Sequence, residues 1–233
     1  MAPVTELILA PINPAVSAAE VASILDASTQ TLLAQPGALR VRRSHVLEDP
    51  SKTRMFVDWE SLEHHQAFAA NAEIYGPFRA AMGPLVDANA GPRVPPYHVE
   101  FVPFPPSELD VHAPGTKADV TELLHAYFPP DISDVERDNV ERTVREFAVE
   151  IGKFADGFTG EMTLGWTVED DVKFKGEPCR VLVGVLGWTS VEAHMKVRDH
   201  EEFARVIPML RNLERLKGME MCHVACVTTE RGN

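Results

Sequence analysis

The chain has 233 residues, of which 45% are hydrophobic and 24% charged, so it can bury a sizeable core and is not disordered. Its formal net charge of −13 disfavours nucleic acid and anionic membrane surfaces as partners, because both would be repelled. Three cysteines without a C-x-x-C pair argue against a disulfide framework or a zinc site, and no apolar run reaches the roughly 20 residues of a membrane span. We therefore expect a cytoplasmic protein.

The first half of the chain predicts the order β-α-β-β-α-β. The predicted strands are Glu6–Ile12, Leu39–Leu47, Arg54–Trp59 and Tyr97–Phe104. A capping box of Ser17 and Glu20 begins the first helix. Residues 48–51 form the turn between the middle strands. Ser61 is predicted to cap a second helix that runs to about Val86 and breaks near Asn71 or Gly76.

The second half predicts the same order. Its predicted strands are Val120–Phe128, Phe158–Val168, Arg180–Trp188 and Met219–Thr228. Ser133 and Glu136 form a second capping box, and residues 169–177 form an acidic hairpin. Ser190 begins a helical stretch that extends to about Leu216, with a break near Asp199 or Pro208.

Four sequence anchors occur twice in the same order, which indicates an internal duplication. The segment VTEL occurs at Val4–Leu7 and at Val120–Leu123, and W-x-S-x-E-x-H begins at Trp59 and again at Trp188. The two remaining pairs are 46–49 with 167–170, and 97–102 with 222–227. We expect two repeats, at residues 1–104 and 118–233, with a proline-rich linker at residues 105–117.

A β-α-β-β-α-β unit is ferredoxin-like, and its two helices cover only one face of its sheet. Two fused units can bury their bare faces against each other, which predicts an α+β fold of two such repeats forming an intramolecular barrel. The strands read as apolar on both faces, for example at residues 181–186, as expected if neither face meets water.

The strand that ends in tryptophan, followed by the W-x-S-x-E-x-H run, resembles the antibiotic-biosynthesis-monooxygenase branch of the dimeric α+β barrel superfamily. The resemblance covers nearly all of both halves and implies a monomeric pseudo-dimer or a homodimer of such chains. That superfamily includes cofactor-free monooxygenases, polyketide cyclases, haem enzymes and muconolactone-type isomerases, so the fold does not determine the chemistry.

His125 and Tyr127 are the first candidate catalytic pair, because they share one face of a strand whose counterparts in the first half are Leu9 and Pro11. A histidine can remove a proton while a neighbouring phenol donates to the developing oxyanion. The alternative is that this pair faces solvent near a sheet edge.

The remaining candidates occupy matched positions in the two halves. His98 and His223, on the closing strands, are candidate catalytic bases or else satisfied core histidines. The candidate substrate-binding residues are Trp59, Trp188, His45 and Trp166. His65 and His194 are interpreted as structural, Ser61 and Ser190 as helix caps, and Arg40 and Arg42 as solvated.

These residues and the resemblance predict a cofactor-independent enzyme of secondary metabolism that acts on a small aromatic or polyketide-like substrate. Proton abstraction would give an enolate or carbanion for a monooxygenase, cyclase or lyase reaction. No nucleotide-binding or metal-binding motif is present in the sequence, so no cofactor and no metal are expected. The alternatives are a non-catalytic binding or interaction protein with a degenerate cavity, and a haem-binding protein.

Overall fold

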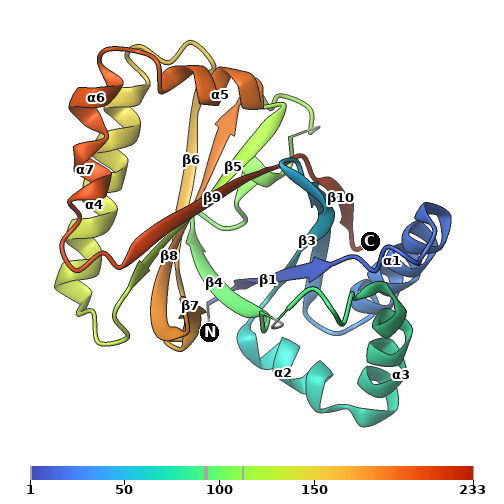
Figure 1. Ribbon diagram of the computed structural model, residues 1–233. Coiled ribbons are helices and arrows are strands. Elements are labelled where there is room, and N and C mark those ends of the chain that lie inside the picture. The colour runs from blue at the N-terminus through green and yellow to red at the C-terminus, as the bar shows by residue number, and fades with distance from the viewer. Residues whose placement is uncertain (1, 92–93, 112, 233) are drawn as a thin grey trace. The chain divides into compact units, whose positions relative to one another are not determined.

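The structure is a computed structural model that describes residues 2–91, 94–111 and 113–232. The chain forms two compact units, residues 1–100 with 226–233, and residues 101–225 (Figure 1). The repeat boundaries at residues 104 and 118 stay a prediction, because packing defines the units and sequence defines the repeats. Among the described residues, no helix has the length and apolar composition that a membrane crossing requires.

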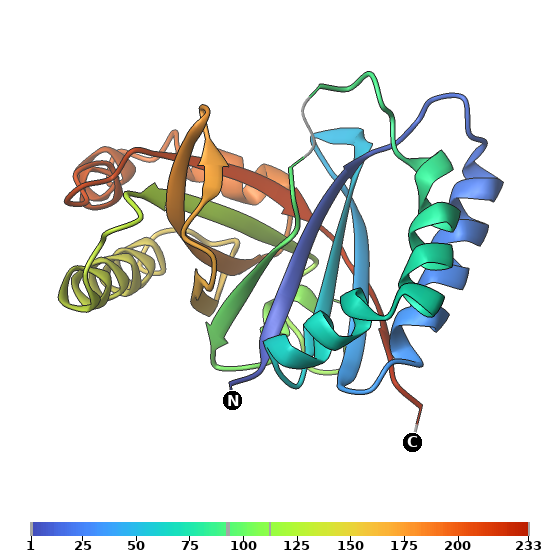
Figure 2. The same ribbon diagram turned by 90° about the horizontal axis from the view of Figure 1, so that it is seen from below.

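The first unit is an antiparallel sheet with helices on one face. Its strands are β1 (Val4–Pro11), β2 (Ala38–Val46), β3 (Asp49–Trp59), β4 (Tyr97–Val102) and β10 (Val227–Glu230), in the spatial order β10-β2-β3-β1-β4. Its helices are α1 (Ala18–Leu33), α2 (Leu62–Ala70), α3 (Ala72–Met82) and the short η1 (Gly83–Leu85). Helices α1 and α3 lie side by side against the sheet (Figure 2).

The second unit repeats this plan. Its strands are β5 (Val120–Phe128), β6 (Phe158–Thr167), β7 (Val172–Phe174), β8 (Glu177–Trp188) and β9 (Gly218–Val224), in the order β6-β8-β5-β9 with β7 beside β8. Its helices are η2 (Ser107–Leu109), α4 (Asp134–Ile151), α5 (Val191–Val197), α6 (Phe203–Val206) and α7 (Pro208–Arg211). Helices α4, α6 and α7 cover one face of the sheet (Figure 1).

The strand orders β2-β3-β1-β4 and β6-β8-β5-β9 are the same, which confirms the α+β class and the two ferredoxin-like repeats. The register is repeated as well. Val4 lies opposite Trp59 as Val120 lies opposite Trp188. Glu6 lies opposite His98 as Glu122 lies opposite His223.

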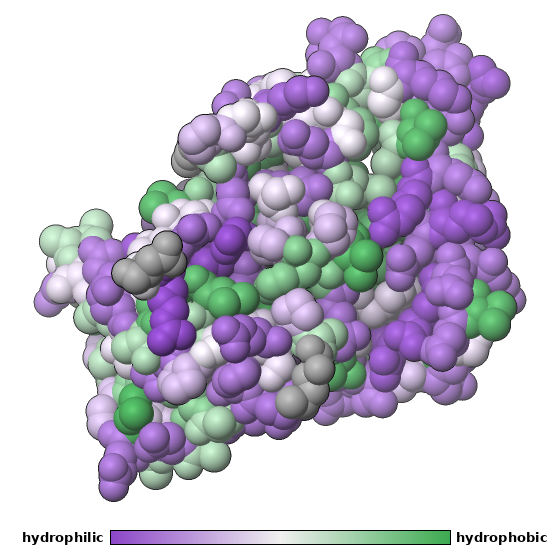
Figure 3. All heavy atoms as spheres, turned by 180° about the vertical axis from the view of Figure 1, so that it is seen from behind, coloured by the Kyte–Doolittle hydropathy of each residue, from purple (hydrophilic) through white to green (hydrophobic). Residues whose placement is uncertain are grey.

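Apolar stripes on the two longest helices supply much of the core. Helix α1 buries Val21, Leu25 and Leu32, and α4 buries Val140, Val144, Phe147 and Ile151. Both predicted capping boxes are present, at Ser17 with Glu20 and at Ser133 with Glu136. The surface seen in Figure 3 is largely hydrophilic, in keeping with the acidic composition.

The last predicted strand was wrong in extent. The strand β9 ends at Val224, and the chain then forms β10, which pairs with the outer edge of β2 and places Thr228 opposite Arg42. Pairing covers an edge that would otherwise expose unpaired backbone groups. The predicted turn at residues 48–51 was also too long, because Val46 pairs directly with Asp49.

The prediction that Arg42 is solvated was wrong too. Its side chain is 0% exposed, and its Nη1 lies 2.8 Å from Asp58 Oδ2. Thr5 donates to the other carboxylate oxygen at 2.7 Å, and the partly exposed Arg40 lies 3.4 Å from Asp58. The sequence did not predict β10, which pairs with β2 beside this ion pair.

Candidate functional site

A chain of four polar side chains lies in the second unit, between β5, β8, β9 and α5. The indole Nε1–H of Trp188 donates to Glu122 Oε2 at 3.0 Å. The same carboxylate oxygen lies 3.5 Å from His194 Nε2. A hydrogen bond of 2.8 Å then joins His194 Nδ1 to His223 Nε2. We call these residues, Glu122, Trp188, His194 and His223, the second tetrad.

Local structure explains why these four residues meet. Trp188 lies opposite Val120, so Glu122 is its diagonal neighbour two residues along β5, and His223 lies directly opposite Glu122 on β9. Ser190 follows Trp188 and caps α5 through a 3.0 Å bond from the Ala193 N–H. The first turn of α5 thereby places His194 over the indole ring, with ring centroids 4.4 Å apart and an interplanar angle of 22°.

The first unit contains the same arrangement, the first tetrad, formed by Glu6, Trp59, His65 and His98. Trp59 Nε1–H donates to Glu6 Oε2 at 3.2 Å, and His65 Nε2 lies 3.6 Å from Glu6 Oε1. His65 Nδ1 and His98 Nε2 are 2.7 Å apart. Here Ser61 makes no capping bond, contrary to prediction, because its Oγ lies 3.2 Å from His64 Nδ1 instead.

The second tetrad carries a titratable group suited to neutral pH. Burial raises the pKa of Glu122 to about 7, and the Trp188 hydrogen bond and the charge of Arg198 oppose the shift. A carboxyl with such a pKa can both accept and release a proton near neutrality. Because His194 contacts Glu122 with one ring nitrogen and His223 with the other, the three groups form a path for a proton.

The first tetrad also meets a distance criterion for metal binding. Glu6, His65 and His98 each offer a ligand atom, and these atoms lie within 4.8 Å of one another. The two ring nitrogens of His65 face different neighbours, however, with Nε2 toward Glu6 and Nδ1 toward His98. One ion can use only one nitrogen of an imidazole ring, so the geometry suits proton transfer better than a three-ligand metal centre.

Each tetrad borders an apolar cavity between the sheet and the helices of its own unit. The second cavity has a volume of about 270 Å³ and is bordered by Glu122, Trp188, His194, Leu124 and Phe147, among others. The first cavity has a volume of about 460 Å³. It is bordered by Glu6 and His65 and by the aromatic residues Phe68, Tyr75 and Phe78. Sites for small organic ligands are typically apolar and have volumes of roughly 300–1,000 Å³, so the first cavity lies within this range and the second lies just below it.

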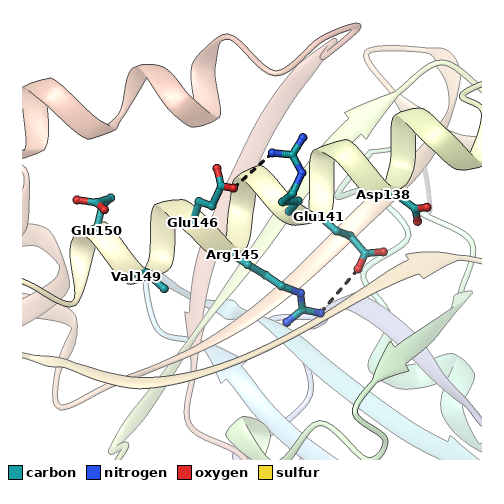
Figure 4. A pocket seen from close by; sticks show the side chains of 7 residues that line it. Asp138, Glu141, Arg145, Glu146, Val149 and Glu150 are labelled. Carbon is teal, nitrogen blue, oxygen red and sulfur yellow. Dashed lines mark hydrogen bonds and ion pairs between the residues drawn. The ribbon is translucent and has the colours of Figure 1, made fainter.

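A third hollow, of about 470 Å³, has a different character. All of its lining residues come from the single helix α4, and they include the ion pairs Arg142–Glu146 and Arg145–Glu141 (Figure 4). It is a depression on a charged helix surface whose side chains already pair with one another. We therefore do not consider it a candidate site.

His125 and Tyr127 are both buried, but on the other face of β5 from Glu122 and Leu124, which border the second cavity. Their rings stack with centroids 6.3 Å apart, and Tyr127 also stacks on Phe174 at 4.2 Å. The Tyr127 hydroxyl donates to Glu220 at 2.9 Å. The expected solvent-facing alternative does not apply, and a catalytic role for the pair stays a prediction.

The other candidates fall into two groups. Trp59, Trp188, His98 and His223 are brought together in the two tetrads. The tetrads also contain His65 and His194, for which the sequence favours a structural role. His45 is exposed and contacts Thr53 at 3.3 Å. Trp166 lies in the core under α4, where its Nε1–H donates to Glu141 at 2.9 Å. Neither His45 nor Trp166 belongs to a tetrad.

Sequence reasoning did not select Glu6 and Glu122, the carboxylates of the two tetrads. Both lie in the duplicated VTEL segment, which we read only as evidence of a repeat. The available signal was a charged residue at the same position of two strands that are otherwise apolar. A buried carboxylate needs partners, and the duplicated tryptophan and histidine were the residues able to provide them.

The fold defines the class of the protein. Over its full length the chain is similar to an anthrone oxidase-like protein, with a TM-score of 0.63 and 14% identity over 95% of that protein. It is also similar to a candidate monooxygenase from Lactobacillus acidophilus NCFM (TM-score 0.53, 9% identity, 100% of this chain and 98% of the other). A chlorite dismutase variant from Candidatus Nitrospira defluvii matches with a TM-score of 0.51 and 9% identity, over 95% and 90% of the two chains. At these identities the likeness establishes a dimeric α+β barrel type of fold.

The particular family match lies in the first half. Residues 14–80 match the model of the antibiotic biosynthesis monooxygenase family. The match confirms the resemblance inferred from the W-x-S-x-E-x-H run, which begins at Trp59 within this range. No curated protein shows significant sequence similarity to the chain.

Proposed function

We propose that the protein is a monooxygenase-type enzyme of secondary metabolism that oxidises a small aromatic or polyketide-like substrate without a cofactor. The observation that carries the proposal is the second tetrad, in which a carboxyl with a pKa of about 7 borders an apolar cavity next to a histidine pair. The family match of residues 14–80 supports the monooxygenase type of reaction. The apolar lining of the second cavity supports the proposal that the substrate is small and hydrophobic.

In this proposal Glu122 is the general base. Its ionised form removes a proton from a carbon next to a phenol or ketone of the substrate, and His194 donates a hydrogen bond to the oxyanion that develops. His223 does not border the cavity, and it orients His194 and receives or returns a proton through Nε2. His223 is therefore a positioning residue. His98 has the same place in the first tetrad.

Dioxygen completes the reaction. The carbanion adds to dioxygen with formation of a carbon–oxygen bond, and a proton from the tetrad gives a hydroperoxide. Loss of water converts the hydroperoxide to a carbonyl, so that a CH2 group and O2 yield C=O and H2O. The apolar lining protects the carbanion from protonation by water before oxygen reacts. All the electrons that reduce dioxygen come from the CH2 group of the substrate, so the reaction needs no other reductant.

We place the reaction in the second unit because its indole and imidazole rings are closely stacked and its carboxyl titrates near neutrality. The first tetrad provides a matched control within the same molecule. Anthrone, a ketone with an acidic CH2 group, is a suitable probe, with oxygen uptake as the measurement. Glu122→Gln should lower turnover by about 100-fold or more, as loss of a general base does, and Glu6→Gln should lower it by less than about threefold.

The proposal fails if both variants oxidise anthrone at the wild-type rate while the wild type is active, or if no enolisable aromatic ketone or phenol is oxidised. The reverse pattern, with loss only in Glu6→Gln, would place the reaction in the first unit. His125→Gln, measured in the same way, tests the role that the sequence predicted for His125. A loss equal to that of Glu122→Gln would make His125 part of the reaction.

A further inference from the structure

The two cavities are lined by equivalent elements but differ in charge. His194 and Arg198 are four residues apart, so they project from the same side of α5, one turn from each other. His194 is buried and Arg198 is exposed, and both border the second cavity. Arg198 therefore marks the opening of the cavity. The corresponding position in the first unit, four residues after His65, is Ala69.

A second arginine borders the same cavity. Arg211 is the last residue of α7 and is exposed. Among the described residues, neither Arg198 nor Arg211 has a carboxylate within salt-bridge distance, although the chain has 35 acidic residues and 22 basic ones. The exposed Arg205 of the neighbouring helix, in contrast, pairs with Glu202 at 2.8 Å.

Two acidic residues, Glu122 and Glu220, are among the residues that line the cavity. Glu122 is bound by Trp188 and lies at the buried end next to His194. Glu220 lies opposite His125 on β9, so its carboxylate is on the other face of the sheet, where it accepts a hydrogen bond from the Tyr127 hydroxyl. The cavity thus has an apolar interior, a carboxyl beside its buried histidine and two arginines that are available at its edge.

We infer that the second cavity binds a hydrophobic aromatic carboxylate, with Arg198 and Arg211 at its carboxylate and the ring system directed toward Trp188 and His194. An arginine binds a planar carboxylate through two parallel N–H donors, and the apolar lining accepts the rings. The inference rests on the proposed function in one respect, which is that it takes the bound aromatic carboxylate to be the substrate. The binding site itself does not require that turnover occurs.

The test is calorimetric titration of the full chain with 2-naphthoate and with its uncharged methyl ester. Naphthoate should bind at least about tenfold more tightly than the ester at low salt, and added salt should reduce the difference because it screens the exposed arginines. The double variant Arg198→Gln/Arg211→Gln should lose this tenfold preference and keep its affinity for the ester. Arg205→Gln, which removes a neighbouring arginine that already has a partner, should behave as the wild type.

The inference is overturned if naphthoate does not bind, if the two probes bind equally well, or if the preference survives in the double variant. Loss of the preference in Arg79→Gln alone would also overturn it, because Arg79 borders the first cavity. Failure of the proposed function has a different signature. In that case naphthoate binds through the two arginines, but no enolisable aromatic ketone or phenol is oxidised.

Discussion

The indole of Trp188 donates a hydrogen bond to the buried carboxylate of Glu122, and the equivalent bond joins Trp59 to Glu6 in the other half. A tryptophan that ends a strand thus satisfies a carboxyl two residues along the neighbouring strand. Both halves of the chain thus contain the tryptophan–glutamate bond, and both contain a hydrogen-bonded histidine pair beside it.

Catalysis should follow the titration of Glu122. The base form exists above its pKa of about 7, so kcat/KM should rise with pH and level off above that value. The rise should be absent from the residual activity of Glu122→Gln and present in Glu6→Gln. A wild-type profile that is flat between about pH 5 and pH 9 would exclude Glu122 as the base.

Folding stability should show the opposite trend. The pKa of Glu122 is raised from 4.5 to about 7 by burial, so the folded state holds a proton that the unfolded state has released in this interval. The resulting stability is complete below about pH 4.5 and is lost as pH rises through 7, by roughly 3 kcal/mol. Urea unfolding of the wild type and of Glu122→Gln across this interval measures the difference. Parallel stability curves for the two proteins would contradict the raised pKa.

Loss of His223 should affect both stability and the orientation of His194. In His223→Phe the buried Nδ1 of His194 loses its 2.8 Å partner, which should destabilise the protein by about 1–3 kcal/mol. His98→Phe is the matched change in the first tetrad and should cost a similar amount. Only His223→Phe should also lower kcat and shift the pH profile. Equal kinetic effects of the two variants would argue against a positioning role for His223.

The ion pair of Arg42 and Asp58 should be far more sensitive than a surface pair. Asp58→Asn leaves a fully buried guanidinium without the negative charge that lies 2.8 Å from it and should lower the free energy of unfolding by about 3–5 kcal/mol. Asp26→Asn removes a partner of Arg43 at 2.7 Å, but Asp26 is 69% exposed, so the change should cost less than about 1 kcal/mol. Urea unfolding measures both, and similar costs would show that the Arg42 site admits water.

Removing β10 tests how the C-terminal strand contributes to the first unit. Thr229→Pro places a residue without an N–H opposite Val41 and should disrupt the pairing with β2. Hydrogen exchange should then accelerate at β2 while the amides of β5 and β8 remain protected. Gly232→Pro, beyond the end of β10, is the control. Unchanged exchange in β2 would mean that β10 does not protect this edge.

The order of secondary structure, the duplication and the type of fold could all be predicted from the sequence. Apolar spacing is a local property, so the stripe of α4 and the strand Val120–Phe128 could be read directly. The capping boxes were equally local. The two histidines on the closing strands and the two tryptophans could also be selected, because they recur at matched positions.

Which of these residues contact one another depends on pairing and packing between segments that are far apart in the chain. Glu122 belongs to the second tetrad because of the register of β5. A shift of β5 by one residue would turn Glu122 to the opposite face of the sheet, where His125 and Tyr127 lie. The pairing of β2 with β10 likewise joins Arg42 to Thr228, which comes almost two hundred residues later in the chain. Contacts between distant segments are not encoded in local periodicity. They arise only when packing brings polar groups out of water and each must find a partner.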